Sequence, residues 1–146
     1  MNKLFRNIGL FAALTVLVTG CASTPGARGA SNVDPEVRAI ERWNLLIAKK
    51  AELAYDYMTP GRRSVETREE YALKMNNRPV QWEKATLMSK QCDTPDNCKV
   101  TIFLDLQVPA IGMTSKTPSF SFSEEIWTRD AKGGWYFLGP ASAVAK

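Results

Sequence analysis

Two carboxylates in predicted strands are the residues most suited to acid–base chemistry. Asp105 interrupts a hydrophobic strand, and a carboxylate buried among apolar neighbours could act as a general base. Alternation along the strand places Asp105 opposite the aliphatic side chains, so we expect it to face solvent. The sequence contains no histidine, which excludes imidazole-based nucleophile activation and the commonest zinc sites. We predict no cofactor and no metal.

Glu124 is the second candidate because its strand face is otherwise apolar. By alternation it shares that face with Phe120, Phe122 and Ile126, which we interpret as core positions. Either Glu124 points into a cavity, or a β-bulge at Glu124-Glu125 reverses the two faces and turns Trp127 inward. We favour the bulge.

Four aromatic residues could line a pocket beside such a carboxylate. Aromatic side chains at this spacing are more often plain core, which is the interpretation we favour for Trp43, Tyr55, Tyr57 and Trp82.

Cys92 and Cys98 flank a short polar segment between two predicted strands, where a turn would set them opposite one another. An exported protein meets an oxidising compartment, so we predict a disulfide between them. The alternative is a redox or metal pair. The five intervening residues do not match a C-x-x-C motif, and no histidine could complete a metal site.

The first residues have the three parts of a secretory signal peptide. Lys3 and Arg6 are basic, an apolar run covers residues 8–18, and Thr19-Gly20 are small. The run is shorter than a membrane-spanning helix requires. Leu17-Val18-Thr19-Gly20-Cys21 resembles the lipobox of bacterial lipoproteins. That resemblance implies cleavage after residue 20 and acylation of Cys21, by palmitate or a similar chain; the alternative is an ordinary secreted protein.

The resemblance also implies an address. In lipoproteins an aspartate directly after the cysteine often retains the protein at the inner membrane, whereas here the residue is Ala22. We therefore expect the outer membrane, facing the periplasm, with the periplasmic side of the inner membrane as the alternative. Small and polar residues continue from 22 to 32, so we assign 1–20 to the signal peptide, 21–33 to the lipidated tether and 34–146 to a globular domain.

The domain begins with two predicted helices. Asp34-Pro35-Glu36 is a helix start, and apolar residues then recur every three or four positions as far as Met58, which predicts one helix of about 24 residues. On this pattern Arg38 and Arg42 lie on the polar side. Thr67 to Glu70 fit a capping box that opens a short second helix, ending near residues 76–77.

Beyond Pro79 the pattern alternates, and turn signals divide it into strands near 80–91, 98–110, 120–130 and 134–139. The second strand places Val100, Ile102, Leu104, Leu106 and Val108 on one face. Its other face carries Lys99, Thr101, Phe103, Asp105 and Gln107, so we expect an antiparallel sheet with one face packed on the helices. The predicted fold class is α+β.

This order of elements, with the ending Trp127-Thr128-Arg129-Asp130 to Gly134-Trp135-Tyr136, resembles the nuclear transport factor 2-like (NTF2-like), or SnoaL-like, superfamily. The resemblance covers residues 34–140 and implies a cone of helices on a curved four-stranded sheet, with an interior pocket in some members. The short strand usual between the first helices has Ser64-Val65 as its candidate. A generic α+β sandwich is the alternative.

Composition excludes few partners. The chain is 45% hydrophobic with a formal charge of +4, and its basic residues are scattered among acidic ones, so we expect no nucleic-acid binding. Our first hypothesis is a non-catalytic binding or scaffold module of the cell envelope, anchored to the membrane by lipid, whose partner is an envelope protein or a small apolar ligand. The alternatives are a small NTF2-like isomerase or hydrolase using Glu124 or Asp105 with a pocket tyrosine, and an accessory component of a secretion or assembly complex.

Overall fold

The computed structural model describes residues 33–110 and 115–144. The predicted signal peptide, Cys21 and the tether as far as residue 32 lie outside the described residues. No helix within the described ranges is long and apolar enough to span a membrane.

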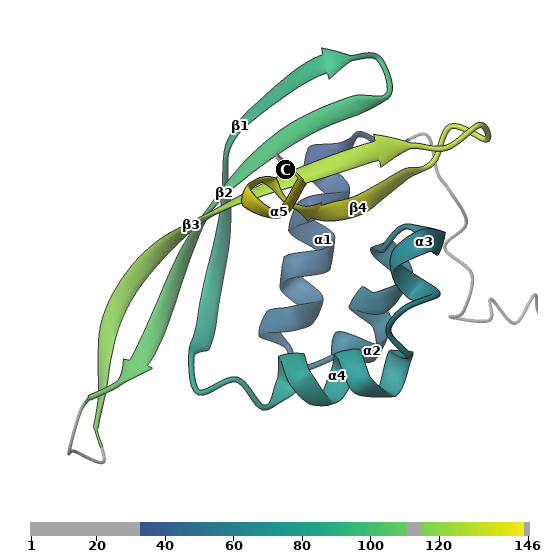
Figure 1. Cartoon of the computed structure of the whole chain (residues 1–146). Coiled ribbons are helices and arrows are strands. Elements are labelled where there is room, and N and C mark those ends of the chain that lie inside the picture. The colour runs from purple at the N-terminus through teal and green to yellow at the C-terminus, as the bar shows by residue number, and fades with distance from the viewer. Residues whose placement is uncertain (1–32, 111–114, 145–146) are drawn as a thin grey trace, which may run out of the picture.

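An antiparallel four-stranded meander forms one layer of the domain. The strands are β1 (Gln81–Thr94), β2 (Asn97–Pro109), β3 (Lys116–Arg129) and β4 (Trp135–Pro140), and they lie in the order β1-β2-β3-β4. The α+β class and all four predicted strands are therefore confirmed, with β3 starting earlier than expected. Figure 1 shows a strongly twisted sheet with its main helices on one side, and the β2–β3 end extends past them.

The strand β2 has the predicted two faces. Val100, Ile102, Leu104 and Leu106 are buried against the helices, whereas the residues between them are half-buried on the outer face. Burial of every second residue provides the apolar area that holds the helical layer on the sheet.

The predicted 24-residue helix is wrong, because the chain breaks at residues 48–50. Helix α1 covers Pro35–Ile47, followed by α2 (Ala51–Ala54) and a 3₁₀ turn, η1 (Tyr55–Tyr57). The N–H of Lys49 donates to the carbonyl of Leu46, and the N–H of Lys50 donates to Leu45, which is the Schellman pattern. Lys49 takes the left-handed conformation (φ 57°) that glycine usually occupies there. No glycine marks the stop in the sequence.

The buried face of α1 also differs from the predicted stripe. Arg38 and Arg42 are 3% and 4% exposed, whereas Val37 is 46% exposed. The Nε atom of Arg38 donates to the carbonyl of Trp135 at 2.7 Å, and its guanidinium stacks 4.6 Å from the ring centre of Tyr57. The arginines of α1 therefore face the interior, because buried hydrogen-bond acceptors and aromatic rings contact their guanidinium groups there.

The helix α4 (Arg68–Asn76) begins with the predicted capping box. Thr67 Oγ1 accepts from the N–H of Glu70 at 3.2 Å, and Glu70 Oε2 accepts from the N–H of Thr67 at 2.9 Å. The hydrogen bonds that the N–H and the hydroxyl of Thr67 donate to this carboxylate lower the pKa of Glu70. The candidate short strand at Ser64-Val65 is wrong: these residues form a turn after helix α3 (Pro60–Arg63).

The two faces of β3 are the reverse of the prediction, and no bulge causes the reversal. Glu125 and Trp127 are buried against the helices, whereas Phe120 and Phe122 are 63% and 57% exposed. The register of β3 with β2 is continuous from Asn97↔Thr128 to Pro109↔Lys116, and the one shift in β3 lies between Ile126 and Trp127, against β4. The phenylalanines belong to the outer face, so they were misassigned to the core.

Two local features fix the strand ends. Cys92 and Cys98 are paired across β1 and β2 and form the predicted disulfide. At the β3–β4 turn, Asp130 Oδ1 accepts from the N–H groups of Lys132 and Gly134, and Gly133 has the positive φ of 86° that glycine tolerates.

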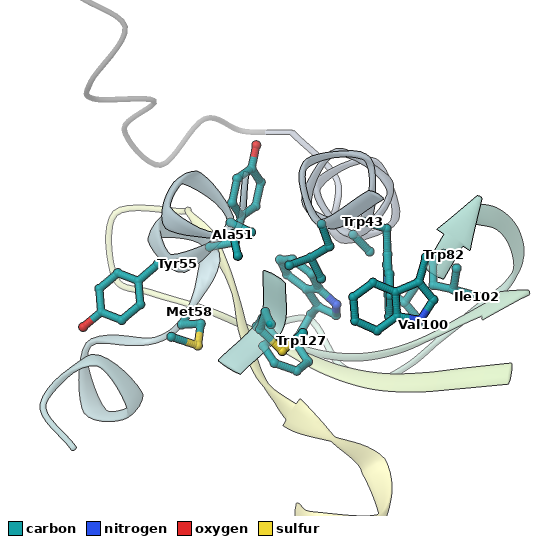
Figure 2. Close-up of a cluster of buried hydrophobic side chains, with 14 of the residues drawn as sticks. Trp43, Ala51, Tyr55, Met58, Trp82, Val100, Ile102 and Trp127 are labelled. Atoms are coloured by element: carbon teal, nitrogen blue, oxygen red, sulfur yellow. The ribbon is translucent and has the colours of Figure 1, made fainter. Parts of the chain in front are cut away.

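The core lies between α1 and the sheet and is rich in aromatic residues (Figure 2). The indole rings of Trp43 and Trp82 meet edge-on, with centres 5.1 Å apart. Tyr55 and Tyr57 are also buried in this cluster, so the four aromatic residues considered as pocket lining are core. The short helix α5 (Ala141–Val144) follows β4 and packs on β3 and β4.

Candidate functional site

The two carboxylates selected from the sequence lie apart on the outer face of the sheet. Asp105 is half-buried there, and Glu124 is exposed with its Oε1 atom 3.7 Å from Nζ of Lys99. Glu124 is paired with Thr101, four positions from Asp105, which corresponds to about 13 Å along an extended strand. The sheet separates both from the buried tyrosines, so the structure does not bring together the carboxylate–tyrosine pair that the enzyme hypothesis needs.

Glu124 does border a surface hollow. The hollow has a volume of about 260 Å³ and is lined by Phe122, Ser123, Glu124, Pro140 and Ser142. It lies where α5 passes β3, and its polar groups are two hydroxyls and one carboxylate. This arrangement offers a shallow recess beside a strand edge.

Glu125 is held inside the domain, and it is not one of the two carboxylates predicted from the sequence. It is 1% exposed and points from β3 toward α1. Its Oε1 atom accepts from Nη1 of Arg42 at 2.9 Å and from Nε1 of Trp43 at 2.8 Å, and its Oε2 atom accepts from Nε1 of Trp127 at 3.0 Å. Two indoles and one guanidinium thus hold both oxygens of a single buried carboxylate.

Arg42 is held as closely as its partner. Its Nη2 atom donates to the hydroxyl of Tyr71 at 3.1 Å, and the guanidinium carbon lies 3.9 Å from the ring centre of Phe137. The Nε atom of Arg42 is buried with no hydrogen-bond partner among the described residues. The cluster joins α1, α4, β3 and β4, because each contributes at least one of these side chains.

The geometry decides what Glu125 can do. A general base must present a free oxygen to the proton that it removes, at hydrogen-bond distance. Both oxygens of Glu125 are instead engaged by donors from the protein, and the side chain is buried. Taking an ion pair out of water is favourable only when its remaining hydrogen-bonding groups are satisfied, and the two indole N–H groups satisfy this carboxylate. The arrangement fits a structural role.

One feature of the sequence does predict this cluster. Taking Trp127 as an inward residue, without a bulge, places Glu125 inward with it by alternation. A buried carboxylate then requires a cation, and Arg42, next to Trp43 on the helix, is suitably placed. Phe120 and Phe122 predict the opposite arrangement, because large apolar residues at alternate positions are typical of a buried strand face.

The outer face carries an exposed aromatic group. The rings of Phe103, Phe120 and Phe122 contact one another, with centres 5.4 to 6.2 Å apart. We call these three residues the phenylalanine patch. Contiguous exposed apolar groups of this kind are typical of interaction surfaces. Residues 33–110 and 115–144 contain no group of three or more side chains arranged to hold a metal ion.

No protein-family model matches the chain, and no curated protein sequence matches it significantly. A solved SEC-C motif-containing protein from Rhodopseudomonas palustris aligns with a TM-score of 0.59 and 14% identity, over 75% of this chain and 79% of that protein. A SEC-C motif-containing protein from Psychrobacter arcticus aligns with a TM-score of 0.49 and 12% identity, over 68% and 55%. An NTF2-like protein involved in plasmid conjugation aligns with a TM-score of 0.40 and 14% identity, over 68% and 48%. The first likeness shows a shared α+β fold; the other two are too weak to support an argument.

Proposed function

We propose that this protein is a lipid-anchored component of the bacterial envelope whose folded domain is a non-catalytic binding or scaffold module. The observation that carries the proposal is the engagement of Glu125, since this carboxylate, the one that is fully buried in the part of the chain that the structure describes, is bonded to Arg42, Trp43 and Trp127. Glu125 therefore stabilises the interior, and we assign binding to the surface of the domain and membrane attachment to the lipid anchor.

The anchor is supported by the sequence before the domain. A basic start, a short apolar run and the lipobox-like Leu17 to Cys21 are correctly spaced for export and acylation. The Cys92–Cys98 disulfide is consistent with an oxidising compartment. Two or three acyl chains hold a protein at a membrane without further contacts.

The finer fold assignment is a divergent NTF2-like domain. The order of helices followed by a four-stranded meander supports it, as does the Trp127 to Tyr136 hairpin. The filled interior, with Trp43 and Trp127 beside Glu125, distinguishes this domain from members of that superfamily with an open pocket.

The binding surface is the phenylalanine patch. Phe120 and Phe122 expose more than half of their area on the face of β3 that is turned away from the helices. An envelope protein with an apolar surface fits this patch, and an accessory role in a secretion or assembly complex is one form of such binding.

Fractionation and mass spectrometry test the anchor. We expect the membrane-extracted chain to begin at Cys21 with diacylglycerol on the sulfur, and Cys21→Ala to move the protein to the soluble fraction. Ala22→Asp is the matched variant, which should keep the anchor but shift the protein from the outer to the inner membrane. A chain that still begins with Met1 would contradict the anchor.

Crosslinking in intact cells tests the surface. The full chain should capture a specific envelope protein, and Phe122→Ser should abolish the capture. Leu73→Ser is the matched control, because Leu73 is also more than half exposed but lies on α4, away from the patch. Equal capture by Phe122→Ser and Leu73→Ser would show that the phenylalanine patch is not the binding surface.

A further inference from the structure

The first half of β3 has an unpaired edge. Strand β4 pairs only with Glu125 to Arg129, so Lys116–Glu124 are bonded to β2 on one side and to no described strand on the other, with α5 bordering the hollow at the Glu124 end. We call Lys116–Glu124 the free edge of β3. Figure 1 shows the beginning of β3 running past β4 and the helices α1 to α4. An unpaired edge offers a row of backbone donors and acceptors to another strand.

The direction of these backbone groups follows from two hydrogen bonds. The N–H of Arg129 donates to Asp96 beside β2, whereas the N–H of Asp130 donates to Gly134 on the β4 side. Backbone groups alternate along an antiparallel strand, and β3 has no register shift against β2. The even-numbered residues of the free edge therefore direct their N–H and C=O groups outward.

We propose that the free edge of β3 pairs antiparallel with the same edge of a second copy of this chain, about a two-fold axis at Phe120. Phe120 is the midpoint of Lys116–Glu124, so all nine positions find a partner in this register. Phe120 then lies opposite Phe120 of the second copy, and their outward N–H and C=O groups face each other. The inference is independent of the lipid anchor and of any other partner.

Charge complementarity selects this register. Lys116 lies opposite Glu124 of the second copy, and the symmetry repeats the pair at the other end. Oppositely charged residues in cross-strand positions stabilise pairing, and like charges oppose it. A register centred on Ser121 would instead place Lys116 opposite Ile126, whose backbone already pairs with Gly139 of β4.

The apolar residues match in the same register. Phe122 lies opposite Pro118 of the second copy, and both phenylalanine patches join on one outer face. Pro118 has no N–H and removes one donor near each end, but its carbonyl still accepts from Phe122 of the other copy. Proline at an outward-facing edge position leaves the bonds to β2 intact, so it limits further strand addition without weakening the sheet.

Both charged residues are accessible in the single chain. Nζ of Lys116 donates to Oε1 of Gln81 at 2.6 Å, and Glu124 lies 3.7 Å from Lys99, both at the surface. Exposed contacts of this kind contribute little to the free energy of folding, so these side chains can change partners readily. In the proposed pairing the side chain of Lys116 from the second copy enters the hollow beside Glu124, which Ser142 of α5 also lines.

Sedimentation of the full-length chain in detergent tests the pairing by charge reversal. We expect a monomer–dimer equilibrium, and Lys116→Glu or Glu124→Lys alone should raise the dimer dissociation constant about tenfold, because each creates two like-charge pairs. The double variant should restore the dimer. A wild type that stays monomeric up to its solubility limit, or a double variant that fails to recover, would overturn the proposal.

Cysteine crosslinking tests the register. Oxidation should link Phe120→Cys chains to each other, whereas Ser121→Cys chains should link poorly, because Ser121 lies opposite Ser119 of the second copy and not opposite itself. Mixed Lys116→Cys and Glu124→Cys chains should crosslink, and neither should link to itself. Crosslinking at Ser121 in preference to Phe120 would place the axis elsewhere and refute the proposed pairing.

Discussion

Arg42 and Glu125 form a buried ion pair between α1 and β3, with Nη1 and Oε1 2.9 Å apart although the two residues are 83 positions apart in the chain. The pair joins the helical layer to the sheet, and Trp43 and Trp127 complete the bonding of the carboxylate. Each side chain is buried because the other is present.

Removing the carboxylate should therefore destabilise the domain strongly. Glu125→Gln leaves the guanidinium of Arg42 buried without its counter-charge, and we expect the free energy of unfolding to fall by about 3 kcal/mol. Urea denaturation measures the loss. The matched control is Glu124→Gln on the exposed face, with an expected change within about 0.5 kcal/mol. Equal effects of the two substitutions would show that burial of Glu125 has no energetic role.

The reversed faces of β3 give a second prediction. Phe122→Ser should change the free energy of unfolding by less than about 0.5 kcal/mol, because the ring is mostly exposed. Trp127→Ala should lower it by about 3 to 5 kcal/mol, because it opens a cavity and removes a donor to Glu125. Thermal unfolding of both variants would distinguish this arrangement from the bulged strand, in which Phe122 is buried as well as Trp127 and both substitutions would be costly.

Lys49 occupies a conformation better suited to glycine. Lys49→Gly should raise the free energy of unfolding by about 0.5 to 1 kcal/mol, since a left-handed residue with a Cβ is disfavoured. The gain is reduced by loss of the exposed hydrogen bond from Lys49 Nζ to the carbonyl of Asn76. Lys50→Gly, at a negative φ, serves as the control and should not stabilise. Chemical denaturation checks both variants.

The capping box should give a pH-dependent contribution. Hydrogen bonds from Thr67 lower the pKa of Glu70 below its ordinary value of 4.5, so their stabilisation is complete above pH 4.5 and is lost as pH falls through the lowered pKa. Thr67→Ala should lower the free energy of unfolding by about 1 kcal/mol at neutral pH. The difference from wild type should shrink in acid, and a constant difference down to pH 2 would contradict this origin.

The disulfide should stabilise the β1–β2 hairpin through the unfolded chain. Cys92→Ala with Cys98→Ala should lower the free energy of unfolding by about 2 kcal/mol, as expected for a short closed loop. Reduction of the wild type should reproduce most of this loss and leave the double variant unchanged. A wild type insensitive to reductant under unfolding conditions would contradict the prediction.

Local chemistry in the sequence determined much of the fold. Pro35, the capping box at Thr67, the strand alternation of β2 and the turn between Cys92 and Cys98 are each specified by neighbouring residues, and each is confirmed. The anchor at Cys21 stays a prediction from the sequence.

Only the tertiary structure decided where the charges and aromatic rings lie. The stop at Lys49 lacks the usual glycine, and the inward turn of Arg38 and Arg42 depends on acceptors from distant strands. Likewise, phenylalanines at every second position in β3 predict a core face, but the helices cover the opposite face, where Glu125 meets its counter-charge. Periodicity identifies two faces of a strand; which of them is buried depends on partners far away in the chain.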